Sequence, residues 1–359
     1  MLTLIIFILV LGVLILVHEL GHFIAAKRNG LTVEEFGFGF PPRIFGIKKG
    51  ETIYSINLLP FGGFVKILGE DGSESNNPKS FSSKSVGSRS LIAASGVFMN
   101  FVMATLLLII GFYIGLPQII DKNNEALAKN VKIQIIAISN DSPAEKSGIK
   151  MGDVVKYVKS ENKNVAINEI SILQENINNS KGKELTITIQ RGKEILEINT
   201  VPRINHPEGE GALGIALAKT GIISYPWHKS FWLGVKSAFV ITWEIIKGFG
   251  GLLKNLITSG KVPQDISGPV GIAVLTSQAA ALGFIYLLQL TAIISLNLAV
   301  LNLIPFPALD GGRLLFLSIE KIKGSKVNPK IENTIHSIGL VLLLALIMLI
   351  TYKDILKLK

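Results

Sequence analysis

The chain has 359 residues, 48% of them hydrophobic, and a positive mean hydropathy. This composition is too apolar for an ordinary soluble enzyme of this length, so we predict a membrane protein in contact with the lipid bilayer. The net charge of +10 could suggest nucleic-acid binding, but the basic residues follow membrane topology instead, and no nucleic-acid partner is expected. Cysteine is absent, which excludes disulfide bonds and thiolate metal ligands.

Four apolar stretches are long enough to cross a bilayer, which requires about 20 residues. They cover residues 1–26, 91–116, 281–304 and 334–352. The first stretch could instead be a signal peptide, but it lacks a basic region at its start and contains a polar cluster. We therefore predict a polytopic α-helical membrane protein with about four transmembrane helices.

Basic residues gather between the first and second spans and between the third and fourth. With four spans these two segments lie on the same side of the membrane, and the positive-inside rule predicts that this side is the cytoplasm. Both chain ends and the long central segment then face the extracytoplasmic side. A multi-pass location in a membrane is therefore expected.

Three segments between the spans have distinct compositions. Residues 31–67 combine aromatic and β-branched residues with Gly and Pro, which predicts a membrane-associated β-region. Residues 68–90 are polar and rich in Gly and Ser, which predicts a cytoplasmic loop. Residues 125–220 predict one α+β domain, with a strand at 131–139 and a hairpin at 185–201.

Residues 226–258 hold all three tryptophans, and their aromatic and aliphatic residues recur at helical spacing between charged residues. This pattern favours an amphipathic helix in the membrane interface. A fifth span interrupted by charge is the alternative.

The first span contains the sequence His18-Glu19-Leu20-Gly21-His22. Residues four apart lie on one face of a helix, so both imidazoles can bind one metal ion. Glu19 then lies beside that ion and can take a proton from a water molecule. Zinc suits imidazole ligands, and ionisable groups at membrane depth are usually functional, so we predict one Zn²⁺ per chain.

Catalytic zinc usually has three protein ligands. We predict Asp310 as the third, because it is the only carboxylate between Asp265 and Glu320 and ends an apolar run. Pro305 and Pro307 should break the third helix before the motif at 309–312. An Asp-Gly-Gly turn at the membrane surface is the alternative for this motif.

Several polar residues near these motifs remain open to more than one interpretation. His206, His228 and His336 are interpreted as ordinary surface or interface residues. Asn297 and Asn302 either join helices or hydrogen-bond the substrate.

The two motifs, His18-Glu-Leu-Gly-His22 and Asn-Leu-Ile-Pro-Phe-Pro-Ala-Leu-Asp310-Gly-Gly, resemble those of the site-2 protease family of intramembrane zinc metalloproteases. More narrowly, the chain is similar to the bacterial regulator-of-sigma-E protease group. The resemblance covers essentially the whole chain. It implies that His18, His22 and Asp310 bind zinc and that Glu19 is the general base. It further implies that Asn297, Asn302, Pro305 and Pro307 handle the substrate.

Other segments carry the same resemblance. The sequence SPAEKSGIKMGDVV resembles a PDZ signature, and GALGIAL resembles a PDZ carboxylate-binding loop in which Gly211 and Gly214 permit close backbone approach. The segment ISGPVGIA (266–273) matches a family segment without an assigned role. Two departures stand out: the chain has room for one PDZ module where better-known relatives have two, and SGVFMN keeps Gly96 and Asn100 of a family element but has Val97 in place of proline.

The predicted function is hydrolysis of peptide bonds in or near the transmembrane segment of single-span membrane proteins. Anti-sigma factors and remnant signal peptides are the expected substrate types, already trimmed by another protease. One alternative is an inactive PDZ-bearing adaptor, but neither the base nor a ligand is missing. A zinc transporter is the other alternative, and the repeated halves that would favour it are not evident in the sequence.

Overall fold

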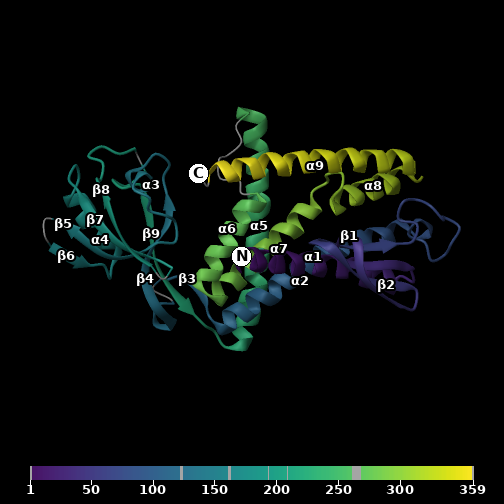
Figure 1. Cartoon of the computed structure of the whole chain (residues 1–359), viewed down its shortest axis with the longest axis horizontal. Coiled ribbons are helices and arrows are strands. Elements are labelled where there is room, and N and C mark those ends of the chain that lie inside the picture. The colour runs from purple at the N-terminus through teal and green to yellow at the C-terminus, as the bar shows by residue number, and fades with distance from the viewer. Residues whose placement is uncertain are drawn as a thin grey trace. The chain divides into compact units, whose positions relative to one another are not determined.

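The computed structural model describes residues 2–121, 124–160, 163–192, 194–207, 209–260 and 268–357, and Figure 1 labels its elements. The helices are α1 (Leu2–Arg28), α2 (Val86–Ile114), α3 (Pro143–Lys146), α4 (Ile170–Asn179), α5 (Trp227–Ser259), α6 (Pro269–Leu282), α7 (Phe284–Leu303), α8 (Asp310–Lys323) and α9 (Pro329–Lys357), with short 3₁₀ turns at Phe81–Ser83 and Glu125–Leu127. The strands are β1 (Val33–Lys49), β2 (Thr52–Ile67), β3 (Leu116–Ile119), β4 (Ala128–Ile138), β5 (Val154–Ser160), β6 (Lys163–Ala166), β7 (Leu185–Arg191), β8 (Glu194–Thr200) and β9 (Ile215–Ile223).

The chain forms two compact units. The first unit combines Met1–Ile110, Phe231–Ala280 and Leu287–Lys359, and the second combines Gly111–Ser230 with Ala281–Tyr286.

Among the described residues, four helices are long and apolar enough to cross a membrane, as predicted: Leu4–Arg28, Val86–Ile114, Phe284–Leu303 and Pro329–Leu356. Most of the side chains in their apolar windows are not buried in the protein, and α9 exposes a long run of leucine, isoleucine and valine. Such surfaces are unfavourable in water and suit lipid contact. The helix α2 begins at Val86, before the predicted start of the apolar span at residue 91, and its first turns contain the polar residues Ser88 and Arg89.

The predicted β-region is a two-stranded antiparallel ribbon that packs on α1. Its register runs from Val33 opposite Ile67 to Lys49 opposite Thr52, with several irregularities along the first strand. Phe36 packs against Phe23 of α1, with ring centroids 5.1 Å apart, while Phe40, Ile44 and other apolar side chains farther along the ribbon are exposed. The ribbon thereby lies beside the part of α1 that carries the HExxH motif.

The second unit contains an antiparallel sheet in the order β3-β9-β4-β5-β7-β8, with β6 paired to β5. The predicted strand at 131–139 overlaps β4, which ends at Ile138, and the predicted hairpin at 185–201 corresponds to β7 and β8. Its core is formed by Ile133, Ile135, Val155, Val158, Leu173, Ile187, Ile189 and neighbouring residues. The carboxylate of Asp153, 1% exposed, accepts two hydrogen bonds from Arg191 at 2.8 and 2.7 Å, which fixes the start of β5 against the end of β7.

Two helices of the first unit, α5 and α6, correspond to segments whose structure the sequence left open. The segment 226–258 is the single long helix α5, and it is not among the four apolar helices named above. Its interfacial placement stays a prediction. The segment ISGPVGIA leads into α6, although its residues 266 and 267 lie outside the described part. The buried carboxylate of Asp354 on α9 accepts hydrogen bonds from the N–H groups of Gly268 and Gly271 at 2.9 and 2.8 Å, so it caps the start of α6.

Candidate metal centre

The two histidines of the HExxH motif lie one turn apart on the same face of α1. His18 and His22 are each 8% exposed, and their Nε2 atoms are 3.2 Å apart. Their rings meet edge to face at a centroid distance of 4.9 Å. Both nitrogens therefore point at one position beside the helix, as expected for residues i and i+4.

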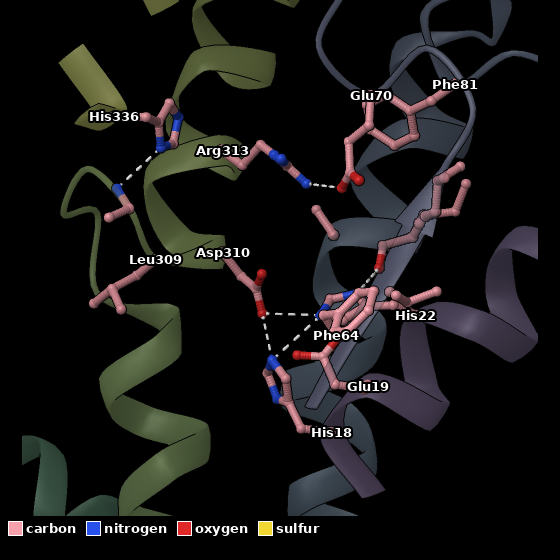
Figure 2. A pocket seen from close by; sticks show the side chains of 15 residues that line it. His18, Glu19, His22, Phe64, Glu70, Phe81, Leu309, Asp310, Arg313 and His336 are labelled. Atoms are coloured by element: carbon pink, nitrogen blue, oxygen red, sulfur yellow. Dashed lines mark hydrogen bonds and ion pairs between the residues drawn. The ribbon is translucent and has the colours of Figure 1, made fainter. Parts of the chain in front are cut away.

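Asp310 joins these two imidazoles from the other end of the chain. The helix α7 ends at Leu303, and α8 begins at Asp310 after a connection that contains Pro305 and Pro307, so the predicted break is present. The Oδ2 atom of Asp310 lies 3.0 Å from Nε2 of His18 and 3.3 Å from Nε2 of His22. Figure 2 shows these three side chains converging.

The geometry of these three atoms fits a tetrahedral zinc ion. Donors about 2.0–2.1 Å from a tetrahedral Zn²⁺ are about 3.3 Å from one another. The three distances of 3.0, 3.2 and 3.3 Å in this structure are close to that value. Among the described residues, His18, His22 and Asp310 form the group of three side chains able to hold a metal ion. Two imidazoles and one carboxylate are also a ligand set that leaves one position open.

The charge state of Asp310 suits a cation site. Burial raises the pKa of the Asp310 carboxyl, but hydrogen bonding and charge from His18 and His22 lower it by more, so its pKa lies below the ordinary range. The side chain is therefore an ionised carboxylate across the physiological pH range, which is the form that binds metal.

Helix α2 orients both imidazoles through their other ring nitrogens. Nδ1 of His22 lies 2.8 Å from the carbonyl oxygen of Ile92, which requires the proton on Nδ1 and leaves Nε2 free as a ligand. Nδ1 of His18 lies 3.4 Å from the side-chain amide of the fully buried Asn100. The Oδ1 atom of Asn100 has no partner among the described residues, so exchanging its amide O and N gives the Nδ1–H of His18 an acceptor.

Two glycines allow α1 and α2 to approach this closely. A Cβ atom at Gly96 would lie 2.4 Å from Nε2 of His22 and 2.6 Å from the His18 ring. A Cβ atom at Gly21 would lie 2.3 Å from the carbonyl oxygen of Ser95. Larger side chains at either position would therefore separate the helices or displace the imidazoles. The segment SGVFMN is helical throughout, so Val97 continues α2.

The three candidate ligand residues line a cavity of about 240 Å³. Figure 2 shows the Glu19 carboxylate pointing toward the same space. The wall opposite α8 includes Phe64 and Val65 of β2. The full lining is His18, Glu19, His22, Phe64, Val65, Ile67, Glu70, Phe81, Ile92, Ala93, Ala308, Leu309, Asp310, Arg313 and His336. The Glu19 carboxylate, the candidate ligands and a strand thus share one cavity.

A partly buried ion pair lies at another side of this cavity. Arg313, three residues after Asp310 on α8, donates a hydrogen bond to Glu70 in the loop after β2. The guanidinium also lies 6.0 Å from the Phe81 ring centre. These contacts fix α8 relative to the β-ribbon. Arg313 and Glu70 are 243 residues apart in the chain, so no local sequence pattern indicates that they pair.

The remaining predicted site residues are not among the residues that line this cavity. Asn297 donates a hydrogen bond from its side chain to the carbonyl oxygen of Ile293 in its own helix, at 2.9 Å. Asn302 lies in the last turn of α7, and Pro305 and Pro307 lie in the connection to α8. Gly211 and Gly214 belong to the second unit, before β9, and Gly214 has a φ angle of +71°.

The amino-acid sequence matches a known peptidase family and several named proteins along most of its length. The sequence profile of peptidase family M50 matches residues 6–346. A Clostridium perfringens protein named "Putative zinc metalloprotease" is 36% identical over 97% of this chain and 96% of its own length. The Oceanobacillus iheyensis protein named zinc metalloprotease RasP is 30% identical over 99% of both chains. The Bacillus subtilis protein named regulator of sigma-W protease RasP is 29% identical over 98% of both chains.

Proposed function

Because the chain belongs to peptidase family M50, we propose that it is an intramembrane zinc metalloendopeptidase of the site-2 protease type. It hydrolyses peptide bonds in or near the transmembrane segment of single-span membrane proteins. The observation that carries this proposal is the triangle of His18 Nε2, His22 Nε2 and Asp310 Oδ2, which shares a cavity with Glu19. Three of these four residues come from a helix that is apolar enough to cross a membrane.

In this proposal each of the four residues has one role. His18, His22 and Asp310 hold the zinc ion, and Ile92 and Asn100 keep the two imidazoles in the required orientation. When bound, zinc polarises the substrate carbonyl and lowers the pKa of an attacking water molecule.

Glu19 performs the proton transfers of the reaction. Its carboxylate takes a proton from the attacking water while the oxygen bonds to the carbonyl carbon. It then gives that proton to the leaving nitrogen as the carbon–nitrogen bond breaks, so the products are a carboxylic acid and an amine, which then exchange a proton to become a carboxylate and an ammonium group. The location of Glu19 in the cavity wall, one residue after His18, supports this assignment.

The substrate would reach the cavity as an extended strand. A helical substrate hides its peptide bonds in intrahelical hydrogen bonds, so it must unwind before attack. The strand β2 lines the cavity with Phe64 and Val65, and the site of Gly63 is close to Glu19, which supports pairing of the substrate with this ribbon. Asn297, Asn302 and the Pro305–Pro307 break are proposed to contact the unwound substrate, since they precede Asp310 at the end of α7.

The second unit is proposed to be a PDZ domain that selects trimmed substrates. Residues Ile215–Ala218 of β9 have no strand partner on their outer edge within the described part of the chain, and α4 contacts β9. A peptide terminus could extend the sheet there, with backbone amides near Gly211 and Gly214 binding its carboxylate. Such selection suits single-span proteins already cut by another protease, and the sigma-W name of the Bacillus subtilis relative supports an anti-sigma-factor type of substrate.

The chain is a membrane protein by its four apolar helices. We assign it to the bacterial inner membrane, with the PDZ domain on the extracytoplasmic side, because the basic segments between the spans favour the cytoplasm.

Cleavage of a single-span model substrate in liposomes tests the proposed function. Glu19→Gln should retain zinc and lose cleavage by about 10²–10⁴-fold, because only the proton transfers are removed. Asp310→Ala should lose zinc. Glu175→Gln, at an exposed position on α4, is the matched control and should cleave like the wild type. Equal cleavage by wild type and Glu19→Gln would refute the catalytic assignment and favour an inactive adaptor.

A further inference from the structure

The connection between α7 and α8 carries the candidate ligand Asp310 in a conformation that needs external support. Pro305 and Pro307 have no backbone N–H to donate. Ala308, two residues before Asp310, has a φ angle of +78°, which is unfavourable for a residue with a Cβ atom. A segment with these features keeps one conformation only when surrounding contacts fix it.

The helix α9 supplies such contacts from one face. Nδ1 of His336 accepts a hydrogen bond of 2.9 Å from the backbone N–H of the strained Ala308. One turn later on α9, Gly339 packs directly on Pro307, since a Cβ atom there would lie 2.4 Å from the proline Cβ. His336 also packs against Phe316 of α8, at a ring-centroid distance of 5.5 Å. Figure 2 shows the His336 hydrogen bond on the wall of the cavity that contains Asp310.

The accepted hydrogen bond fixes the form of the His336 ring. A nitrogen that accepts a hydrogen bond carries no proton, so the ring is neutral and its proton is on Nε2. Nε2 is buried and has no hydrogen-bond partner among the described residues. Nδ1 is occupied by Ala308, and His336 is not in the group of possible metal ligands found in the described chain. Within the described part of the chain, the hydrogen bond that this ring makes is therefore the one with Ala308.

We propose that His336 is a positioning residue: by holding the Ala308 N–H, it fixes the connection that places the Asp310 carboxylate opposite His18 and His22. This inference rests on the proposed role of Asp310 as a zinc ligand. Residues that orient a metal ligand typically change metal affinity by about 10–100-fold when removed.

Zinc affinity of the purified full-length protein, measured by competition with a chelator, tests this role. The Oδ1 atom of an asparagine occupies nearly the position of the histidine Nδ1, whereas a glutamine places its amide near Nε2. His336→Asn should therefore keep the acceptor and bind zinc within about threefold of the wild type. His336→Gln and His336→Leu should bind zinc about 10–100-fold more weakly. Ser337→Leu is the matched control, because Ser337 is exposed and its hydroxyl bonds only to Asn333 of its own helix.

Wild-type zinc affinity in His336→Leu would overturn the inference, as would equal losses in His336→Asn and His336→Gln. If His336→Leu fails to fold, the difference in zinc affinity between His336→Asn and His336→Gln still tests the proposal. Asp310→Ala is measured in parallel. If Asp310→Ala binds zinc as tightly as the wild type, the proposed ligand set is wrong. If Asp310→Ala loses zinc while His336→Leu retains it, only the proposed role of His336 is wrong.

Discussion

Substitution of Gly96 by alanine tests whether the close contact between α1 and α2 forms the metal centre. The added Cβ atom would lie 2.4 Å from Nε2 of His22 and within 2.8 Å of the His18 ring. Reaching an ordinary separation of about 3.4 Å requires the imidazoles or the helix to move by about 1 Å. Zinc–ligand distances tolerate deviations of only about 0.2 Å. We therefore expect zinc affinity to fall by at least about 10–100-fold, or about 1.4–2.8 kcal/mol.

The same substitution should leave the protein folded. Overpacking costs about 1–3 kcal/mol, but alanine is favoured over glycine within a helix by up to about 1 kcal/mol. The expected net loss of about 0–2 kcal/mol is small compared with the loss of metal binding. Thermal unfolding of the metal-free protein and chelator competition separate the two effects.

Gly87→Ala is the matched control on the same helix. Its Cβ atom would meet only the Ser85 hydroxyl, at 4.0 Å, so neither zinc affinity nor folding should decrease. If Gly96→Ala binds zinc as tightly as the wild type and Gly87→Ala, the packing of α2 against the histidines does not determine the site, and the reasoning is wrong.

Three further substitutions test other contacts of the first unit. Asn100→Ala removes the proposed acceptor for Nδ1 of His18 and should weaken zinc binding by about 10–100-fold in chelator competition; unchanged affinity would exclude this contact. Asp354→Ala removes the cap of α6 and should lower the free energy of unfolding by about 0.5–2 kcal/mol while zinc affinity stays unchanged. An unchanged free energy of unfolding would contradict the capping role. Arg89→Ala leaves the carboxylate of Glu320 buried without its partner and should lower the free energy of unfolding by about 3–5 kcal/mol, measured by thermal unfolding. Arg89→Met combined with Glu320→Leu should restore most of this stability. A double variant as unstable as Arg89→Ala would argue against the ion-pair explanation.

Local patterns in the sequence predicted the elements that depend on neighbouring residues. Four long apolar runs predicted the four apolar helices, and Pro305 and Pro307 predicted the end of α7 because proline cannot continue a helix. Alternation around Arg191-Gly192 predicted the β7–β8 hairpin. The helices α6 and α8 were not predicted, because a short apolar run and a glycine pair do not identify a helix by periodicity alone.

The surroundings of the metal centre depend on tertiary contacts that no local pattern reveals. The sequence suggested an ordinary surface or interface position for His336, but the structure places it against Ala308, 28 residues away. Gly96 and Asn100 were noted only as parts of a familiar element, and their contacts with the histidines require knowledge of how α2 crosses α1. A signal was available for Asn100, because an asparagine within an apolar stretch long enough to cross a membrane usually has a polar partner.

The two histidines of the candidate metal centre are positioned by one helix crossing, that of α1 with α2, whereas Asp310 comes from α8. Gly21 lies on the same helix as the two histidines and contacts the backbone of Ser95, while the next residue along α2, Gly96, contacts the histidine rings. These reciprocal contacts bring the Ile92 carbonyl and the Asn100 side chain, eight residues apart on α2, to the two Nδ1 atoms. In lipid, small residues permit close helix packing and polar contacts then strengthen it. The same glycines that hold α1 to α2 therefore also set the orientation of both imidazoles, so helix packing and metal binding cannot vary independently at this crossing.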